Sequence, residues 1–184
     1  FGHEVSSWPS AAAFASADAP DLVIGAYGDP PSASTFYQPE SIAVDASDNL
    51  WVSDTFNHRV LRIPPPYTAG ADLVLGQADF ISNASNRGGP PAANTFNFPR
   101  GLAFDGAGNL YVADIYNNRV VQFAPPFSDG QAAVALFGQP SFADNTARTT
   151  ADGLYVPTAV VAHPNGYIFI ADRNNNRVLR WTPG

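Results

Sequence analysis

Cysteine, methionine and lysine are absent from the 184-residue chain, and only 14% of its residues are charged. Without cysteine the chain has neither disulfides nor thiolate metal ligands. No apolar run approaches the roughly 18 residues that a membrane-spanning helix needs, so the sequence predicts no membrane partner. Nine dispersed arginines face sixteen acidic residues, for a net charge of −7. An acidic chain without a basic stripe repels phosphate backbones, and we therefore expect no nucleic-acid partner.

Turn-forming and β-favouring residues make up much of the remaining composition. Seventeen prolines and fifteen glycines accompany thirteen phenylalanines and seven tyrosines, and 45% of the residues are hydrophobic. This composition is typical of a globular domain built from short strands and many turns. The first residue is Phe1 and no signal-peptide pattern follows it, so we expect the sequence to be a processed product or an excerpt of a longer chain.

One seven-residue motif occurs three times, with spacings of about 60 residues. It reads Asp-Thr-Phe-Asn-His-Arg-Val at 54–60, Asp-Ile-Tyr-Asn-Asn-Arg-Val at 114–120 and Asp-Arg-Asn-Asn-Asn-Arg-Val at 172–178. A period of this length indicates one supersecondary unit repeated, in which each copy buries its apolar face only against a neighbour.

The second copy shows the unit most clearly. Short apolar segments at 99–105, 110–113, 119–123 and 133–137 are separated by Gly, Asn, Asp and Pro turns, which predicts a four-stranded antiparallel meander. The other copies align with it element by element and raise the predicted total to thirteen strands. We therefore divide the single segment 1–184 into strands three and four of a preceding unit (1–26), two complete units (39–76 and 99–138) and the first three strands of a last unit (157–184).

The recurring aspartates have two interpretations. Each carboxylate either accepts backbone N–H groups in the loop between strands two and three, or serves as a metal ligand or catalytic acid. Recurrence favours the structural role, because a catalytic residue is needed once per site whereas a turn is needed once per unit. The arginine five residues later is expected to bridge carbonyls or an Asp between adjacent units. These residues are Asp54, Asp114 and Asp172, with Arg59, Arg119 and Arg177.

The motif resembles the NHL repeat. Asp-x-x-Asn-(Asn/His)-Arg-Val follows Ala-Val-Asp-x-x-x-Asn-Leu-(Trp/Tyr)-Val and a proline before the first strand, and the resemblance extends over essentially the whole chain. It implies an all-β fold, an NHL-type β-propeller of four-stranded antiparallel blades around a central channel. About three blades would form an incomplete ring within this chain. Val-Leu-Gly-Gln at 74–77 and Leu-Phe-Gly-Gln at 136–139 resemble the variant common in bacterial extracellular NHL proteins, which implies an extracellular or periplasmic location.

An incomplete ring leaves an apolar blade face and a strand edge to be covered. We expect the cover to come from further blades of the same chain or from other copies, as a closed homo-oligomer or an open filament.

Candidate ligand-binding residues lie where the repeats differ. In a propeller, loops between strands two and three share a face with the connections between blades. Glu40, Arg100 and Thr158 follow the proline before strand one, and the loop tips add Phe56, His58, Tyr116 and Arg173. Variation on a constant scaffold is typical of binding surfaces, so we expect these residues to contact a protein, peptide or carbohydrate ligand. The alternative is that they are solvated loop residues.

No catalytic residue, metal site or cofactor is predicted. The NHL family includes RNA-binding domains, a metal-using peptide-amidating lyase and many uncharacterised binding proteins. His58 and His163 are expected on opposite faces, and no nucleophile–base pair or paired glutamates stand in a supporting context. Oxygen ligands for calcium are abundant, but nothing specifies such a site.

We therefore expect a non-catalytic binding or scaffold propeller that acts through loop surfaces or self-association, within a larger extracellular protein or assembly. The alternative is a metal-dependent lyase or hydrolase of NHL-propeller type whose catalytic residues lie largely outside this segment.

Overall fold

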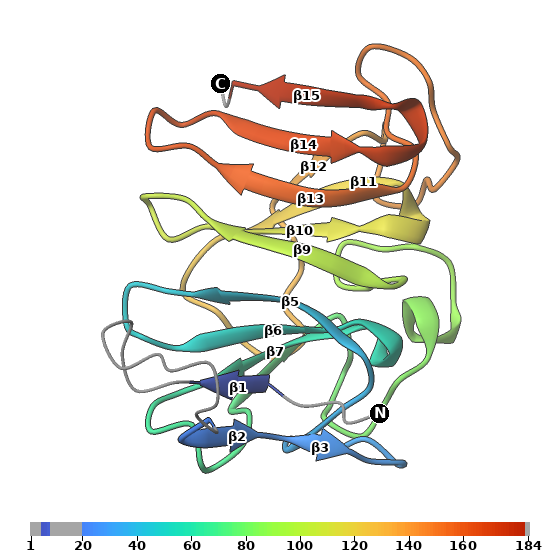
Figure 1. The fold of residues 1–184 in the computed structure, drawn as a ribbon. Helices are drawn as coiled ribbons and strands as arrows, with labels where there is room; N and C mark the ends of the chain where they lie inside the picture. Colours follow the sequence, from blue (N-terminus) through green and yellow to red (C-terminus); the bar gives the residue numbers. More distant parts are fainter. Residues whose placement is uncertain (1–4, 8–19, 183–184) are drawn as a thin grey trace.

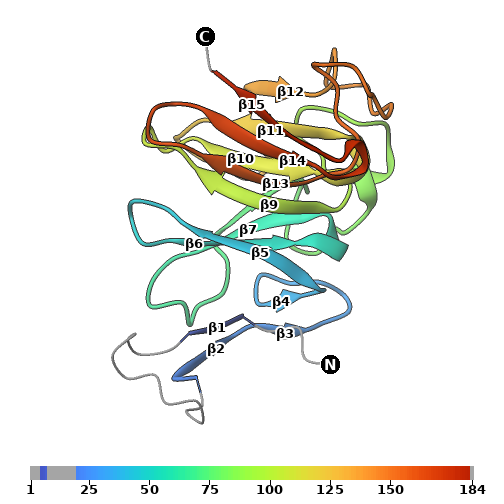
Figure 2. The same ribbon diagram turned by 45° about the horizontal axis from the view of Figure 1, so that its top comes forward.

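The computed structural model describes residues 5–7 and 20–182, which form an all-β molecule (Figure 1). Three antiparallel sheets, two of four strands and one of three, stack on one another (Figures 1 and 2). A two-stranded antiparallel sheet lies at the N-terminal end of this stack. Within the described ranges the helices are 3₁₀ turns of three or four residues, and none is long and apolar enough to cross a bilayer. Residues 1–4, 8–19 and 183–184, which belong to the predicted end units, lie outside the described part.

The two four-stranded sheets repeat the predicted meander, with neighbouring strands in chain order. The first contains β5 (Pro39–Val44), β6 (Leu50–Asp54), β7 (Arg59–Ile63) and β8 (Leu73–Leu75). The second contains β9 (Pro99–Phe104), β10 (Leu110–Asp114), β11 (Arg119–Phe123) and β12 (Ala135–Phe137).

The end sheets have fewer strands. The last contains β13 (Pro157–Ala162), β14 (Ile168–Asp172) and β15 (Arg177–Trp181), and at the other end β1 (Val5–Ser7) pairs with β2 (Leu22–Ile24). A parallel pair, β3 (Ala26–Tyr27) and β4 (Thr35–Phe36), was not among the thirteen predicted strands. Two-residue strands carry no readable periodicity, which explains why sequence analysis missed them.

Alternating side chains bury the central sheets on both faces. In β10, Leu110 and Val112 join the core shared with the β5–β8 sheet, whereas Tyr111 and Ala113 join the core shared with the β13–β15 sheet. The fully buried Trp51 of β6 packs into the first of these cores. Since successive residues of a strand point to opposite faces, each central sheet packs against a neighbouring sheet on both of its faces.

The first strands of successive sheets lie side by side. β9 neighbours β5 on one side and β13 on the other, and the approach to β13 is close (Figure 1). A Cβ atom on Gly101 would lie 2.7 Å from the Cα of Ala159, so only glycine fits there. This packing brings the N-terminal ends of β5, β9 and β13 together on one side of the stack (Figure 1).

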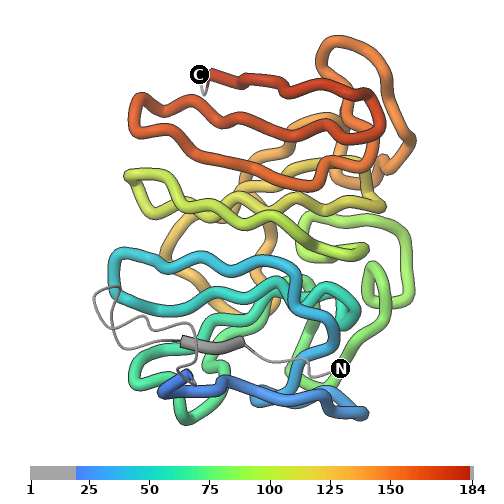
Figure 3. The backbone as a smooth tube through the Cα atoms, in the orientation of Figure 1, coloured from blue at the N-terminus to red at the C-terminus, as the bar shows by residue number. Residues whose placement is uncertain are grey.

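The described residues do not close into a ring. The first described strands and the last strands lie at opposite ends of the stack (Figure 3). The outer face of the β13–β15 sheet exposes Val161 and Val178, and at the other end β5 exposes Ile42 and Val44. The fold is therefore a run of propeller blades with apolar surface at both ends.

Candidate functional site

The loop after the second strand of each sheet has the same backbone conformation in all three repeats. A 3₁₀ turn follows the aspartate, as η2 (Thr55–Asn57), η4 (Ile115–Asn117) and η5 (Arg173–Asn175). The next residue is left-handed, with φ of 53° at His58, 50° at Asn118 and 52° at Asn176. Asparagine tolerates this conformation better than most residues, which fits its recurrence. The three loops gather on one side of the stack, on the right in Figure 1.

Asp54, the last residue of β6, is fully buried and surrounded by donors. Its Oδ1 accepts a hydrogen bond from the backbone N–H of Tyr37 (2.6 Å), and its Oδ2 accepts from Arg59 Nε (2.7 Å) and Asn57 Nδ2 (2.9 Å). Burial raises the pKa of Asp54, against the attraction of Arg59. The carboxylate therefore anchors the segment that leads into β5. It does not cap an N–H of its own turn, where sequence analysis had placed its partners.

Arg59 joins three stretches of backbone through one buried guanidinium. Besides its bond to Asp54, it donates to the carbonyl oxygens of Ser32, Thr35 and Phe80. The predicted bridging of carbonyls by the arginine is confirmed, but its aspartate partner lies in its own sheet and the carbonyls lie in the connections that precede and follow that sheet.

The same network occurs in the other two repeats. Arg119 Nε donates to Asp114 Oδ2 and Arg177 Nε to Asp172 Oδ2, each at 2.8 Å. The Arg119 side chain is fully buried, while that of Arg177 is 26% exposed because no further sheet covers it among the described residues. The geometry supports the structural interpretation of all three aspartates.

His58 is buried and connects two sheets. Its Nδ1 accepts a hydrogen bond from the backbone N–H of Phe98 (3.1 Å), and its ring packs edge-on against the Phe98 ring. Burial lowers the pKa of His58 to about 4. In the next repeat Asn118 Oδ1 accepts from the N–H of Val156 (2.8 Å). His58 was predicted as a loop-tip ligand residue, and the structure places it beneath the surface as a link between repeats.

Two of the residues predicted near the channel mouth contact each other. Arg100 on β9 and Glu40 on β5 form an ion pair in which Arg100 Nη2 donates to Glu40 Oε1 (2.8 Å). Thr158 is half-buried on the adjacent strand β13. The pair joins neighbouring first strands and remains partly exposed on the loop side.

The remaining predicted residues lie in the 3₁₀ turns. Phe56 is half-buried, while Tyr116 and Arg173 are exposed. Thr55 and Ile115, which occupy the position of Arg173 in their turns, are buried against the following sheet. Exposure of Arg173 therefore follows from the uncovered face of the last sheet.

Phe56 and Tyr116 belong to a continuous row of five aromatic rings across the loop side. Adjacent ring centroids lie 4.9–5.4 Å apart, in mostly edge-to-face contacts. We call this set the aromatic row; in spatial order it contains Tyr27, Tyr37, Phe56, Phe98 and Tyr116. Sequence analysis missed Tyr27, Tyr37 and Phe98. The available signal was an aromatic residue one or two positions before the proline of a first strand, as in Phe98-Pro99.

A small hollow of about 90 Å³ adjoins one end of the aromatic row. Two rings of the row stand beside amide and carboxylate side chains there. We call it the loop hollow; its lining residues are Tyr27, Gly28, Asp29, Tyr37, Asn57 and Asn83.

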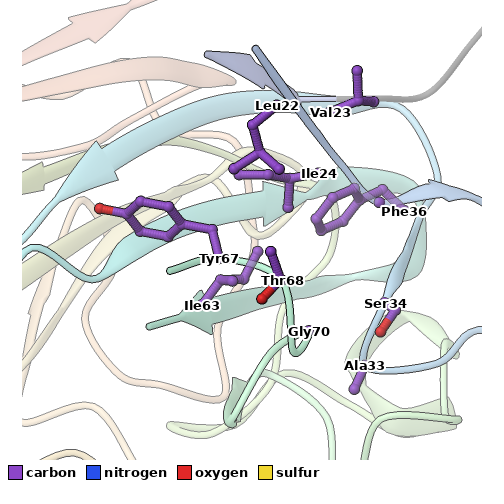
Figure 4. Close-up of a pocket in the computed structure, with 11 residues that line it drawn as sticks. Leu22, Val23, Ile24, Ala33, Ser34, Phe36, Ile63, Tyr67, Thr68 and Gly70 are labelled. Atoms are coloured by element: carbon purple, nitrogen blue, oxygen red, sulfur yellow. The ribbon is translucent and has the colours of Figure 1, made fainter. Parts of the chain in front are cut away.

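A second pocket, of about 200 Å³, lies between β2 and the β5–β8 sheet (Figure 4). Leu22 and Ile24 of β2 approach Phe36, Ile63 and Tyr67 across it. These side chains belong to or pack against the core that joins the two elements. The pocket is therefore a gap in core packing, and it lacks the convergent polar groups of a ligand site.

The described residues do not form the metal site that the alternative, a metal-dependent lyase or hydrolase of NHL-propeller type, would need. In residues 5–7 and 20–182, no three His, Asp or Glu side chains gather in a group that could hold a metal ion. Nδ1 of His58 is engaged within the fold, and that of His163 accepts a hydrogen bond from the N–H of Asn165 (3.1 Å) at the β13–β14 turn.

Comparison with known proteins gives a family match and several relatives. The family model described as "NHL repeat" matches residues 36–63 and 96–123. The chain is 30% identical to a mouse (Mus musculus) peptidyl-glycine alpha-amidating monooxygenase over 148 residues, which cover 78% of this chain and 13% of the relative. It is 29% identical to peptidyl-alpha-hydroxyglycine alpha-amidating lyase 1 of Drosophila melanogaster, covering 78% of this chain and 25% of that protein. The chain thus spans a quarter or less of these relatives.

Solved structures share the fold at low identity. A structural genomics protein of unknown function from Bacteroides thetaiotaomicron superimposes with a TM-score of 0.58 at 17% identity, over 86% of this chain and 36% of that one. An auxiliary nutrient binding protein from the same organism gives 0.55 at 14% identity, over 80% and 37%. A streptogramin B lyase gives 0.51 at 10% identity, over 79% and 37%.

Proposed function

Because this chain belongs to the NHL-repeat family of β-propellers, we propose that it is a non-catalytic binding or scaffold module whose loop side holds the ligand. One observation carries the proposal. The Asp and Arg side chains that recur in every repeat hold the fold, while Glu40, Arg100, Tyr116 and Arg173, whose positions differ between repeats, lie at least partly exposed on the loop side. A constant framework with a variable surface is the usual design of a binding module.

The arginine side chains illustrate this division. Arg59 and Arg119 are buried among carbonyls, whereas Arg100 is partly exposed beside Glu40. The Glu40–Arg100 pair stands at the end of the aligned first strands, where a ligand lying across the channel mouth would contact it.

The similarity to amidating enzymes supports a second candidate function. In this alternative the chain is part of a metal-dependent lyase or hydrolase of NHL-propeller type, and its catalytic residues lie largely outside this segment. The relatives named as amidating enzymes favour it. Against it stand the engaged His58 and the arginine-bound aspartates of the described residues.

Location and assembly are part of the same proposal. We place the protein outside the cytoplasm, in an extracellular or periplasmic setting, on the basis of its Gly-Gln variant of the repeat. The uncovered sheet faces would pack against further blades, supplied by the same chain or by other copies.

An NMR titration tests the proposal. The ¹⁵N-labelled chain, supplied with zinc, is titrated with a soluble neutral polysaccharide, a proline-rich peptide and a peptidyl-α-hydroxyglycine, while mass spectrometry follows the last probe. We expect at least one probe to shift amide signals of the 3₁₀ turns and of the N-terminal ends of β5 and β9, without conversion of the hydroxyglycine. Conversion would favour the lyase, and absence of loop-side shifts with all three probes would overturn the proposal.

Charge reversal at Arg100 tests whether the ligand contacts the Glu40–Arg100 pair. Arg100→Glu places two carboxylates together at the channel mouth, and we expect the Kd of the binding probe to rise about tenfold. Arg62→Glu is the matched control, because Arg62 also pairs with a carboxylate, Asp72, but lies by the Asp45 turn at the opposite ends of the strands. An equal effect of both substitutions would place the ligand elsewhere.

A further inference from the structure

The aromatic row is not required by the repeat. Gln38, Phe98 and Val156 occupy equivalent positions before the first-strand prolines, and all three have left-handed φ values of 50–59°. Phe56, Tyr116 and Asn174 are likewise equivalent in their 3₁₀ turns. The backbone conformation therefore forms with or without an aromatic side chain, and the rings serve something other than the turn.

The rings also do not fill the hydrophobic core. The three core clusters lie between the sheets, and none of them contains a member of the aromatic row. Among the described residues, the row ends at Tyr27, which is 54% exposed, and at Tyr116, which is 51% exposed. The rings between them, Tyr37, Phe56 and Phe98, are half-buried. A contiguous aromatic surface, exposed at both ends, on a framework that does not need it indicates a binding surface.

The loop hollow narrows the class of ligand. It places the carboxylate-bearing Asp29 and the amide-bearing Asn83, both exposed, beside the rings of Tyr27 and Tyr37. A carboxylate accepts hydrogen bonds from hydroxyl groups, and an amide side chain both accepts from them and donates to them, while an aromatic face packs against an apolar ring face. A sugar ring offers hydroxyls on its rim and C–H groups on its faces, so it matches both features.

Charge distinguishes a neutral glycan from a nucleic acid, which also stacks on aromatic rings. Proteins that bind single-stranded nucleic acid combine such rings with a positively charged groove. Here the chain carries a net charge of −7, and Arg100 beside the row is paired with Glu40. The loop hollow adds Asp29, a further negative group that repels phosphate.

We propose that the aromatic row and the loop hollow form a binding site for a neutral glycan chain, in which one sugar lies over the mouth of the hollow and successive sugars lie along the rings toward Tyr116. This inference rests on the proposed loop-side binding function and names its ligand class. The row runs from the segment before β5 to the turn after β10, so the glycan would bridge two consecutive sheets.

Affinity electrophoresis in gels containing a linear β-1,4-glucan, a β-1,3-glucan, a xylan or a mannan tests the site. We expect one of these neutral polysaccharides to retard the chain. Tyr27→Ala and Tyr116→Ala should each raise the Kd at least tenfold, because each removes an exposed ring at one end of the site. Tyr155→Ala is the control: Tyr155 is exposed, occupies the position of Tyr37 in the third repeat and lies outside the row. Its Kd should stay within twofold of the parent value.

The outcomes separate this inference from the proposed function. The glycan site would be overturned if no polysaccharide retards the chain, or if all three tyrosine substitutions weaken the retardation equally. If a proline-rich peptide or a single-stranded oligonucleotide then shifts the loop-side amides, the binding function stands with a different ligand. If no probe shifts them, both proposals fail. Unchanged melting temperatures of the variants establish that lost binding is not lost folding.

Discussion

At the scale of single residues, the most informative side chain is His58. Its position in the repeat requires a hydrogen-bond acceptor in a left-handed backbone, which Asn118 supplies in the next repeat. A histidine fulfils this role only while Nδ1 carries no proton. Burial lowers the pKa of His58 to about 4, so the neutral form is retained in the folded protein at neutral pH.

This arrangement predicts a pH dependence of stability. The pKa of His58 is lower in the folded state than its ordinary value of 6.5, so the unfolded chain binds the extra proton first. The contribution of His58 is therefore complete above pH 6.5 and is lost as the pH falls from 6.5 toward 4. We expect a loss of about 2 kcal/mol of unfolding free energy across this range. Urea denaturation at a series of pH values measures it.

The control comes from the chain itself. His58→Asn copies the side chain of position 118, accepts the same kind of N–H and does not titrate. Its unfolding free energy should show a smaller loss between pH 6.5 and 4 than that of the parent. Parallel pH profiles for the two proteins would contradict the role assigned to His58.

In the buried aspartate–arginine pairs, the cost of burying the charges opposes the attraction between them. Burial raises the pKa of Asp114 against the attraction of Arg119, so desolvation offsets much of what the ion pair contributes. The guanidinium compensates by donating to the carbonyl oxygens of Phe142, Ala92 and Thr95. These pairs therefore specify the path of the chain more than they add stability.

At the scale of elements, the turn between the first and second strands differs among repeats. Asp45 Oδ1 accepts hydrogen bonds from the N–H groups of Ser47 (2.9 Å) and Asn49 (3.0 Å), and Oδ2 accepts from Trp51 Nε1 (2.9 Å). Burial favours a higher pKa, but the bonds from Trp51 and Asn49 outweigh it and hold the pKa of Asp45 below its usual value. In the third repeat His163 stands at this position, and within the described residues its side chain accepts a single hydrogen bond, from the backbone N–H of Asn165.

Restoring the aspartate should stabilise the third turn. His163→Asp supplies two acceptor oxygens where one nitrogen now serves, and we expect a gain of about 0.5–1 kcal/mol at pH 7. For a chain of this size that raises the melting temperature by about 2–3 °C. The gain should disappear as the pH falls below about 4, because a carboxylate stabilised by hydrogen bonds is lost on protonation.

The reverse exchange, Asp105→His in the second repeat, removes a comparable set of bonds and should lower the melting temperature. Differential scanning calorimetry at pH 7 and pH 3.5 measures both variants. A destabilised His163→Asp would show that the ring contacts of His163 with Tyr167 and Phe169 contribute more than the added turn bonds.

At the scale of the whole molecule, the two ends of the stack determine how it associates. Val178 is 69% exposed and Val161 is 58% exposed on the outer face of the β13–β15 sheet, whereas Val120, the equivalent of Val178 in the β9–β12 sheet, is fully buried. Transfer of such apolar surface out of water is favourable, so this face is expected to find a cover.

We predict that the chain self-associates through this face when no further blade covers it. The double variant Val161→Lys, Val178→Lys should raise the dissociation constant of that association at least tenfold, as measured by sedimentation velocity. Ile81→Lys is the control, because Ile81 is 67% exposed in a loop and not on a sheet face. A parent chain that stays monomeric at 19.5 kDa up to millimolar concentration would contradict the prediction.

Local sequence determined most of the fold. The repeated Asp-x-x-Asn-x-Arg-Val motif, the alternation of apolar residues and the Gly, Asn, Asp and Pro turns together predict antiparallel four-stranded meanders of propeller type, because these signals act within about 40 residues of chain. The structural role of the recurring aspartates also followed from repetition alone.

Which side chains meet at the candidate site was decided only by the stacking of the sheets. Arg100 meets Glu40 from 60 positions away, His58 bonds to the backbone of Phe98 from the next repeat, and five rings from separate segments form one row. Periodicity says which face a side chain points to, but not which side chain of another sheet stands opposite. That depends on the distance and angle between packed sheets, which the whole core sets at once.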